Sequence, residues 1–341
     1  MLYIAAAVCA CGPEPNAISP VGSQPAQVFA AVPLARDVRS SGTWQTFPLM
    51  PGEAEGIVRA ADGNFWVANY AAYGSLVRFT PSGRKQSFSV GWGAEEIAAD
   101  RKGELFFTNG RLLSAILKFD PQTRQTTEIF LNDDTNGGIA LGADGNIWVV
   151  ELSHIAKVAP DGRLLKEYAT PGWTSGGTGL TWARGKVWYL GGAGISSLDP
   201  RNGNIASYEA HAYTGGGIVA TDGSLFVAVG GFNGIYDLIR FDLKTETVTT
   251  YKSPRRFLAN GFPDDVAAAP DGSVWYAAAR LDRGNREEGG GFVRFDVRSK
   301  RFTTYASPNH LPANQDVTVA PDGKVWGTAG YAVTVLDPTP R

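Results

Sequence analysis

Short apolar segments separated by turn residues alternate along the whole chain, and one such unit recurs from end to end. In the copy that runs from Asp144 to Glu151, an Asp-Gly pair is followed by apolar residues that include Trp148. Variants stand at Asp62-Gly63 before Trp66, at Asp271-Gly272 before Trp275 and at Asp322-Gly323 before Trp326. Because Gly tolerates positive φ, an Asp-Gly pair between two apolar runs predicts a β-hairpin.

The turn glycines set the period of a repeat protein. They are Gly63, Gly103, Gly145, Gly185, Gly223, Gly272 and Gly323, at intervals of roughly 40 to 50 residues. Each unit has an apolar strand before the turn, a second strand that ends near an aromatic residue, a third strand such as Leu117–Asp120 and a polar last strand such as Thr247–Tyr251. Four antiparallel strands with the most polar one outermost describe a propeller blade. The sequence therefore predicts an all-β, seven-bladed β-propeller of four-stranded antiparallel blades.

The two ends of this repeat region complement each other. The last unit stops after its third strand, near Asp337, whereas Thr43–Pro48 has the pattern of an outer strand with no blade before it. We expect this N-terminal strand to join the last blade and close the ring, so that no open sheet edge remains. The propeller then spans residues 43–341. A β-helix or open solenoid would need a shorter period, and a two-domain sandwich would not explain one pattern across the middle of the chain.

The N-terminal residues have a different character. Residues 1–11 are apolar, and Val8-Cys9-Ala10-Cys11 resembles a bacterial lipobox, which predicts export and lipidation of Cys11. No Lys or Arg precedes this segment, so either an upstream basic segment is missing or the segment is simply an apolar tail. Residues 12–42 are rich in Pro, Ala, Ser and Gln, as expected of a flexible tether. We therefore expect an extracytoplasmic protein that meets the membrane only through its anchor.

Composition and charge narrow the class of partner. Hydrophobic residues make up 43% of the chain, which is ample for a core. The net charge is -2, and the basic residues are scattered rather than gathered in a stripe, which argues against nucleic acid as a partner. The two cysteines both precede Gly12, so the rest of the chain has no thiolate metal site. We expect a monomer.

The repeat sequences Gly-Ala-Asp-Gly-Asn-Ile-Trp-Val-Val-Glu, at 142–151, and Ala-Pro-Asp-Gly-Ser-Val-Trp-Tyr-Ala-Ala, at 269–278, carry a family resemblance. The chain resembles the streptogramin (virginiamycin B) lyase family from about residue 43 to residue 338. Gluconolactonase-like and NHL-repeat propellers share much of this pattern. The resemblance implies a Mg²⁺-assisted lyase that linearises a cyclic depsipeptide. In that reaction a general base removes the proton α to an ester carbonyl, and the metal stabilises the enolate.

Glu151 and His154 are the candidate catalytic residues. The family's site pairs a Glu and a His two residues apart with carboxylates of neighbouring loops, and here Glu-Leu-Ser-His is one residue longer. Glu151 is the one acid at its place among the seven repeats. The blade that follows offers no carboxylate in its entering loop. The plain alternative is that His154 is a partly exposed loop residue with no special role.

Acidic residues before the first strands of several blades form a second candidate set. Glu55, Glu96, Asp265 and Asp316 should converge on the mouth of the channel and serve as metal ligands. Oxygen ligands from several loops suit Mg²⁺ or Ca²⁺ better than zinc. The alternative is that these carboxylates cap turns or pair with arginines.

The aromatic residues fall into two groups. Those that follow the turns, such as Trp66 and Trp148, occur once per repeat and are expected to pack between blades. Others lie in variable loops on the expected working face, where exposed aromatics often contact ligands. With two charged residues of one such loop they give the predicted substrate-binding set, which is Tyr70, Tyr73, Trp173, Phe232, Tyr331, Arg280 and Asp282.

The sequence as a whole thus favours an exported, lipid-anchored propeller that binds a small molecule or peptide at the mouth of its channel. Two classes of function remain open. One is an enzyme, either a metal-assisted carbon–oxygen lyase or a lactone hydrolase. The other is a non-catalytic binding propeller of the cell envelope, which the lost Glu-x-His spacing favours.

Overall fold

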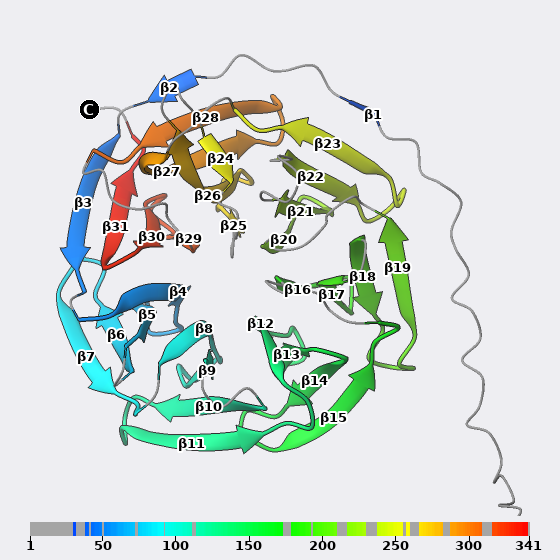
Figure 1. The fold of residues 1–341 in the computed structure, drawn as a ribbon. Helices are drawn as coiled ribbons and strands as arrows, with labels where there is room; N and C mark the ends of the chain where they lie inside the picture. Colours follow the sequence, from blue (N-terminus) through cyan, green and yellow to red (C-terminus); the bar gives the residue numbers. More distant parts are fainter. Residues whose placement is uncertain are drawn as a thin grey trace, which may run out of the picture.

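The fold is a closed ring of seven β-sheets around a central axis (Figure 1). The computed structural model describes residues 30–31, 38–40, 42–49, 51–71, 74–91, 93–110, 114–172, 179–191, 194–209, 217–229, 237–254, 257–259, 266–281, 287–308 and 316–339. Each sheet is a blade, and in blades 1–4 the four strands run in sequence order from the axis outward. The described residues contain no helix. The predicted seven-bladed propeller of four-stranded antiparallel blades is confirmed.

The strands of the first four blades follow one another without interruption. Blade 1 has β4 (Glu53–Arg59), β5 (Phe65–Tyr70), β6 (Ser75–Phe79) and β7 (Lys85–Ser89). Blade 2 has β8 (Ala94–Ala99), β9 (Leu105–Asn109), β10 (Ala115–Asp120) and β11 (Gln125–Phe130). Blade 3 has β12 (Thr135–Leu141), β13 (Ile147–Glu151), β14 (His154–Val158) and β15 (Leu164–Ala169). Blade 4 has β16 (Leu180–Ala183), β17 (Lys186–Gly191), β18 (Gly194–Leu198) and β19 (Ile205–Glu209).

Each of the remaining three blades is joined by one strand from residues 30–48, which precede blade 1. Blade 5 has β20 (Ile218–Thr221), β21 (Ser224–Val229), β22 (Asp237–Asp242) and β23 (Val248–Lys252). Blade 6 has β24 (Phe257–Ala259), β25 (Val266–Ala268), β26 (Val274–Leu281), β27 (Glu287–Asp296) and β28 (Arg301–Ala306). Blade 7 has β29 (Val317–Val319), β30 (Val325–Ala329), β31 (Ala332–Asp337) and, outermost, β3 (Thr43–Pro48).

The Asp-Gly turns form as the sequence predicts. In blade 3 the Asp144 carboxylate accepts the N–H of Asn146 at 3.1 Å, and Gly145 has a φ of 80°. The same bond joins Asp62 to the N–H of Asn64 at 2.9 Å. The Asp side chain thus replaces a backbone acceptor, while the Gly takes the left-handed conformation at no steric cost.

Every second strand is buried between two neighbouring blades, which explains its continuous apolar character. All five residues of β13 are buried. Ile147 and Val149 pack with residues of blade 2, whereas Trp148 and Val150 pack with residues of blade 4. The aromatic that follows each turn is buried in the same way, as predicted, at Trp66, Phe106, Trp148, Trp188, Phe226, Trp275 and Trp326. Between blades 1 and 7 the Phe65 and Trp326 rings stack at 4.1 Å.

The ring closes through both ends of the repeat region. Strand β3 pairs antiparallel with β31 from Thr43 opposite Asp337 to Pro48 opposite Ala332, which confirms the predicted closure. A second link lies nearer the axis, where the buried Asp316 carboxylate of blade 7 accepts the backbone N–H of Ile57 in blade 1. Blade 7 is therefore fixed to blade 1 at its outer edge and at its inner end.

Two short strands come from the segment that we predicted to be a tether. Strand β1 (Ala30–Ala31) pairs parallel with β23, and β2 (Val38–Ser40) pairs parallel with β28, so both lie on the outside of the ring (Figure 1). Residues 1–11, with Cys11, lie outside the described ranges. Within those ranges, no helix is long and apolar enough to cross a membrane.

The inner strands of blades 1, 2 and 3 are irregular. Their registers shift between Ala54 and Ile57, between Ala94 and Ile97, and between Thr135 and Ile139. Such β-bulges bend a strand and re-aim its side chains, and they are frequent beside functional sites. A functional site is therefore expected on the side of the ring formed by blades 1–3.

Replacing Asp316 with Ala should destabilise the ring. The change removes the acceptor of a buried backbone N–H, which costs about 1 to 3 kcal/mol. Urea unfolding would measure the loss. Asp322→Ala, in an exposed turn of the same blade, is the control and should cost less. Equal stability of the Asp316→Ala variant and the wild type would contradict this account of ring closure.

Candidate functional site

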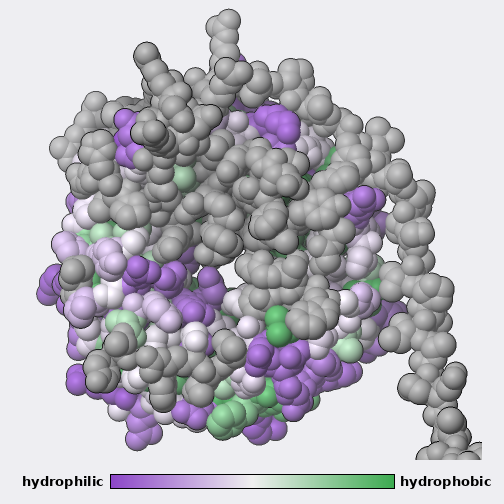
Figure 2. Space-filling view, in the orientation of Figure 1, coloured by the Kyte–Doolittle hydropathy of each residue, from purple (hydrophilic) through white to green (hydrophobic). Residues whose placement is uncertain are grey.

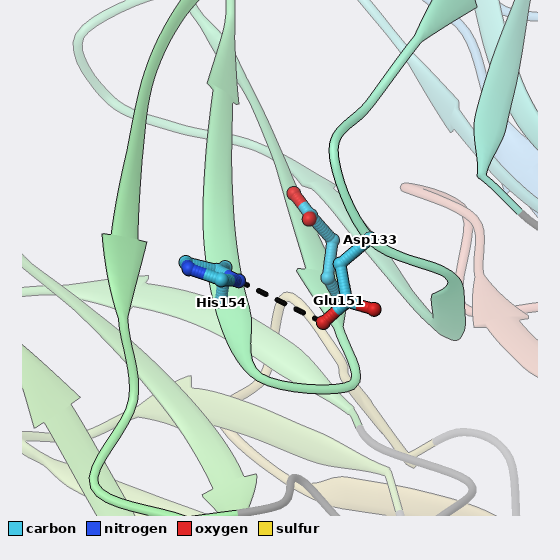
Figure 3. A group of neighbouring side chains, drawn as sticks. All are labelled: Asp133, Glu151 and His154. Carbon is cyan, nitrogen blue, oxygen red and sulfur yellow. Dashed lines mark ion pairs between the residues drawn. The ribbon is translucent and has the colours of Figure 1, made fainter. Parts of the chain in front are cut away.

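Three side chains of blade 3 come together at the end of the blade that carries the β13–β14 connection. They are Asp133, Glu151 and His154, and one potential ligand atom of each lies within 4.8 Å of the others. Among the described residues this is the one group of three or more His, Cys, Asp or Glu side chains with that geometry. Figure 3 shows the group, with a dashed line for the ion pair between Asp133 and His154.

Strand register places Glu151 and His154 on the same face of the blade. Glu151 ends β13, His154 begins β14, and only Leu152 and Ser153 connect them. Val150 pairs with Ile155, so the next residues outward, Glu151 and His154, flank the connection on a common side. The Glu-Leu-Ser-His spacing therefore still brings acid and imidazole together, although it is one residue longer than the spacing in the resembled family.

Asp133 lies in the connection from β11 to β12 and holds the β13–β14 turn. Its Oδ2 accepts the backbone N–H of Ser153 at 2.9 Å and also the Ser153 hydroxyl. The Ser153 Oγ lies 3.0 Å from His154 Nδ1, and Asp133 Oδ2 lies 3.7 Å from the same nitrogen. The hydrogen bond from the Ser153 side chain lowers the pKa of Asp133. Asp133 is thus ionised and directed at one side of the imidazole.

Glu151 has the opposite character. Its side chain is fully buried, and burial, followed by the nearby carboxylates of Glu167 and Asp133, raises its pKa to about 8. A carboxyl group with that pKa keeps its proton at neutral pH. Two carboxyl groups side by side, one ionised and one protonated, are typical of acid–base sites, because environment alone sets their different states.

Ser153 is not arranged as a nucleophile. Its hydroxyl donates to Asp133 and lies at His154 Nδ1, on the same side of the ring as Asp133. In a catalytic triad the serine and the carboxylate occupy opposite nitrogens of the histidine, so that the ring can take the serine proton. The geometry here instead favours a chain in which Nδ1–H donates to Ser153 and Ser153 donates to Asp133. That chain leaves Nε2 as the basic nitrogen.

The predicted metal ligands at the channel mouth do not form a comparable group. Glu55 lies on the bulge of β4, where burial, then Glu53 and Glu95, raise its pKa to about 7. Glu96 lies on the bulge of β8, and Asp316 binds backbone N–H groups of Ile57 and Val317. Asp265 lies outside the described residues. The structure therefore does not gather Glu55, Glu96 and Asp316 within metal-ligand distance of one another.

The described members of the predicted substrate-binding set lie on three different blades. Tyr70 ends β5 with 41% of its surface exposed, and Tyr331, in the turn of blade 7, is 51% exposed. Arg280, near the end of β26, pairs with Glu288 at 3.6 Å. The other members lie outside the described ranges and are Tyr73, Trp173, Phe232 and Asp282. Figure 2 shows an opening near the middle of one face of the ring, with hydrophilic side chains along part of its border.

Our sequence analysis missed Asp133. A signal was present, because Asn132-Asp133-Asp134 directly precedes the inner strand of the blade that carries Glu151 and His154. The acids that the sequence pattern singled out precede the inner strands of other blades, whereas Asp133 precedes the inner strand of the blade that carries the histidine.

Comparison with solved structures places this fold among known propellers. A streptogramin B lyase aligns with a TM-score of 0.71 at 19% identity, covering 87% of this chain and 98% of that chain. A virginiamycin B lyase from Staphylococcus aureus aligns with a TM-score of 0.68 at 16% identity, covering 86% of this chain and 99% of that chain.

A further similar structure is the extracellular domain of a one component system from B. thetaiotaomicron, with a TM-score of 0.61 at 16% identity, covering 89% of this chain and 44% of that chain. At these identities the likeness establishes a shared fold, and the expected resemblance to streptogramin lyases is confirmed at that level. Protein-family models and curated protein sequences give no match.

Replacing Glu151 with Gln should change the pH dependence of stability. The folded protein holds the Glu151 proton up to a pKa of about 8, whereas an ordinary glutamate releases it near 4.5. Between these two pKa values the folded state binds a proton that the unfolded state releases. The contribution of this carboxyl group to the free energy of unfolding is therefore fully present below pH 4.5, and it is lost as the pH rises through about 8.

The side chain at position 151 of the Gln variant is uncharged at every pH, whereas Glu151 of the wild type becomes a buried carboxylate at alkaline pH. The Tm of the variant should therefore exceed that of the wild type by at least about 2 °C at alkaline pH. Calorimetry near pH 5 and near pH 9 would measure this difference in Tm, which should be smaller at the lower pH. Glu55 and Glu95 titrate in both proteins, so their effects cancel in this comparison. An equal gap at both pH values would count against a buried, protonated Glu151.

Proposed function

We propose that this protein is an exported acid–base enzyme of the carbon–oxygen lyase type, with His154 as its general base. The observation that carries this proposal is the Asp133–Ser153–His154 chain, which holds one nitrogen of a partly exposed imidazole and leaves the other for a ligand. The class of reaction is an elimination, in which a base removes the proton α to an ester carbonyl and the ester oxygen departs.

The charges around His154 support this role. Its side chain is 34% exposed, so a ligand can reach the ring, and Asp133 is 25% exposed beside it. An ionised Asp133 stabilises the imidazolium that forms when Nε2 takes a proton. Glu151, buried and protonated, is the third member of the group. While protonated it adds no second negative charge beside Asp133, and it can donate that proton to the departing ester oxygen, the resulting carboxylate being balanced by the imidazolium.

The fold supports the same proposal. Two structures that share it over nearly their whole length are streptogramin and virginiamycin B lyases. A third is a catalytically inactive histidine-to-alanine variant of the S. aureus virginiamycin B lyase with quinupristin, again aligned over 99% of that chain, with a TM-score of 0.67 at 16% identity. A histidine is therefore important in that protein, and we infer that His154 has the corresponding chemical task here.

The Asp133 group also fits a divalent cation. The two carboxylates suit Mn²⁺, and Mg²⁺ is commonly held by one or two carboxylates with water. Ca²⁺ takes six to eight oxygen ligands, which is more than this group supplies. Asp133, Glu151 and His154 would hold the ion once Glu151 and the coordinating imidazole nitrogen have lost their protons, so cation binding is an alternative to the acid–base role described above. When bound, it would supply stabilisation for negative charge on an ester carbonyl oxygen.

Export is the remaining part of the proposal. It rests on the apolar segment at residues 1–11 with its lipobox-like Val8-Cys9-Ala10-Cys11, which we expect to be lipidated at Cys11. The similarity to an extracellular domain is consistent with it.

Quinupristin serves as the first probe of the reaction. We expect the purified protein to convert it to a linear isomer of unchanged mass, because elimination adds no water, whereas hydrolysis would add one. His154→Ala should lower kcat/KM by at least about 100-fold. Arg163→Ala, an exposed residue of the same blade, is the control and should leave the rate unchanged.

Mass spectrometry with a time course distinguishes the outcomes. Tight binding of quinupristin without turnover would replace the lyase by the non-catalytic binding propeller. A product heavier by one water would point to a lactone hydrolase. Turnover that survives His154→Ala would remove His154 from the mechanism.

Cation binding has its own measurement. We expect Mn²⁺ to raise the Tm of the wild type, since a ligand bound only by the folded state stabilises it. Asp133→Asn should weaken Mn²⁺ affinity by at least about tenfold in calorimetric titration. Asp322→Asn, in the exposed turn of blade 7, is the matched control. An unchanged affinity in Asp133→Asn would place the ion elsewhere.

A further inference from the structure

We propose that Glu167 is a positioning residue that holds Asp133 against His154 by clamping Asn132. Glu167 stands on β15, the outermost strand of blade 3, whereas Asn132 directly precedes Asp133 in the connection from β11. The effect on catalysis rests on the function proposed above. The clamp itself is a statement about geometry and can be tested without any substrate.

The contact engages both oxygens of one carboxylate. Glu167 Oε1 accepts the backbone N–H of Asn132 at 3.0 Å, and Oε2 accepts the side-chain amide of the same residue. Two parallel bonds fix the orientation of Asn132 as well as its position. Because Asn132 and Asp133 share a planar peptide bond, this contact also restricts the position of the Asp133 backbone.

Glu167 shares a face of the blade with the site. In the β14–β15 ladder His154 pairs with Ala169, and Ala156 pairs with Glu167. Residues two apart on a strand point to the same side, so Glu167 lies on the side of His154. Glu167 is also among the groups that raise the pKa of Glu151, so its carboxylate lies near that residue too.

The neighbouring blade provides an internal comparison. In blade 2, Glu128 pairs with Leu117 on the outermost strand, at the position that corresponds to Glu167 opposite Ala156. Glu128 is exposed, whereas Glu167 is partly buried. Among the described residues, no hydrogen bond joins Glu128 to the connection that precedes its blade. The clamp depends on Asn132, which reaches Glu167 from the preceding connection.

The test compares Glu167→Ala, Glu167→Gln and Asn132→Ala with Glu128→Ala as the matched control. The first readout is the Cε1–Hε1 NMR signal of His154, which the His154→Ala spectrum identifies among three histidines. We expect Glu167→Ala and Asn132→Ala to move this signal in the same direction, because both release the Asp133 connection. Glu167→Gln keeps one acceptor oxygen and should move it less.

The second readout is Mn²⁺ affinity, and the third is the split between kcat and KM for quinupristin. Releasing a residue that orients a ligand weakens binding by about 10- to 100-fold. We expect a loss in that range for Glu167→Ala, with kcat falling more than KM rises. The double variant with Asn132→Ala should lose no more than Glu167→Ala alone, because Glu167→Ala already removes both bonds, including the one that Asn132→Ala removes.

The outcomes separate the two proposals. If the wild type neither turns over quinupristin nor binds Mn²⁺, the proposed function fails, while the NMR comparison still decides the clamp. If the His154 signal in Glu167→Ala matches that of Glu128→Ala, the clamp is overturned even in an active enzyme. Should Glu167→Ala fold poorly, Glu167→Gln and Asn132→Ala give the same comparison.

Discussion

The structure depends on one constraint, which is that the second strand of each blade must be buried on both faces. Strand β13 shows it most clearly, since Ile147 and Val149 pack toward blade 2 while Trp148 and Val150 pack toward blade 4. A single blade cannot satisfy this requirement, so the blades are stable only as a closed ring. The pairing of β3 with β31 and the bond from Ile57 to Asp316 complete that closure.

A ring held in this way leaves its connections available for chemistry. Blade 3 uses two of them, the β11–β12 connection with Asp133 and the β13–β14 turn with Ser153, and hydrogen bonds join the two directly. Rigid strands on either side hold the turn in place. The site thus has the usual arrangement in which a packed scaffold positions functional side chains on loops.

The protonation states in the site follow from differences in solvation. Asp133 receives hydrogen bonds from Ser153, which favour its ionised form. Glu151, only a turn away, is enclosed by the blades and faces other carboxylates, so its neutral form is favoured. The charge of the carboxylate is the same in both residues, so it does not explain why their pKa values are shifted in opposite directions. Burial and hydrogen bonding give one the role of a fixed negative charge and the other the role of a proton holder.

The sequence by itself determined the blades, their number and the way the ring closes, because turn chemistry and strand period are local and are repeated seven times. It also singled out Glu151 and His154. Only the tertiary structure decided that Asp133 and Ser153 complete the group, that Glu151 is buried and protonated, and that Asp316 is bound to backbone of the next blade. The physical reason is that these properties depend on which connection lies beside which turn. Period and composition do not encode that proximity.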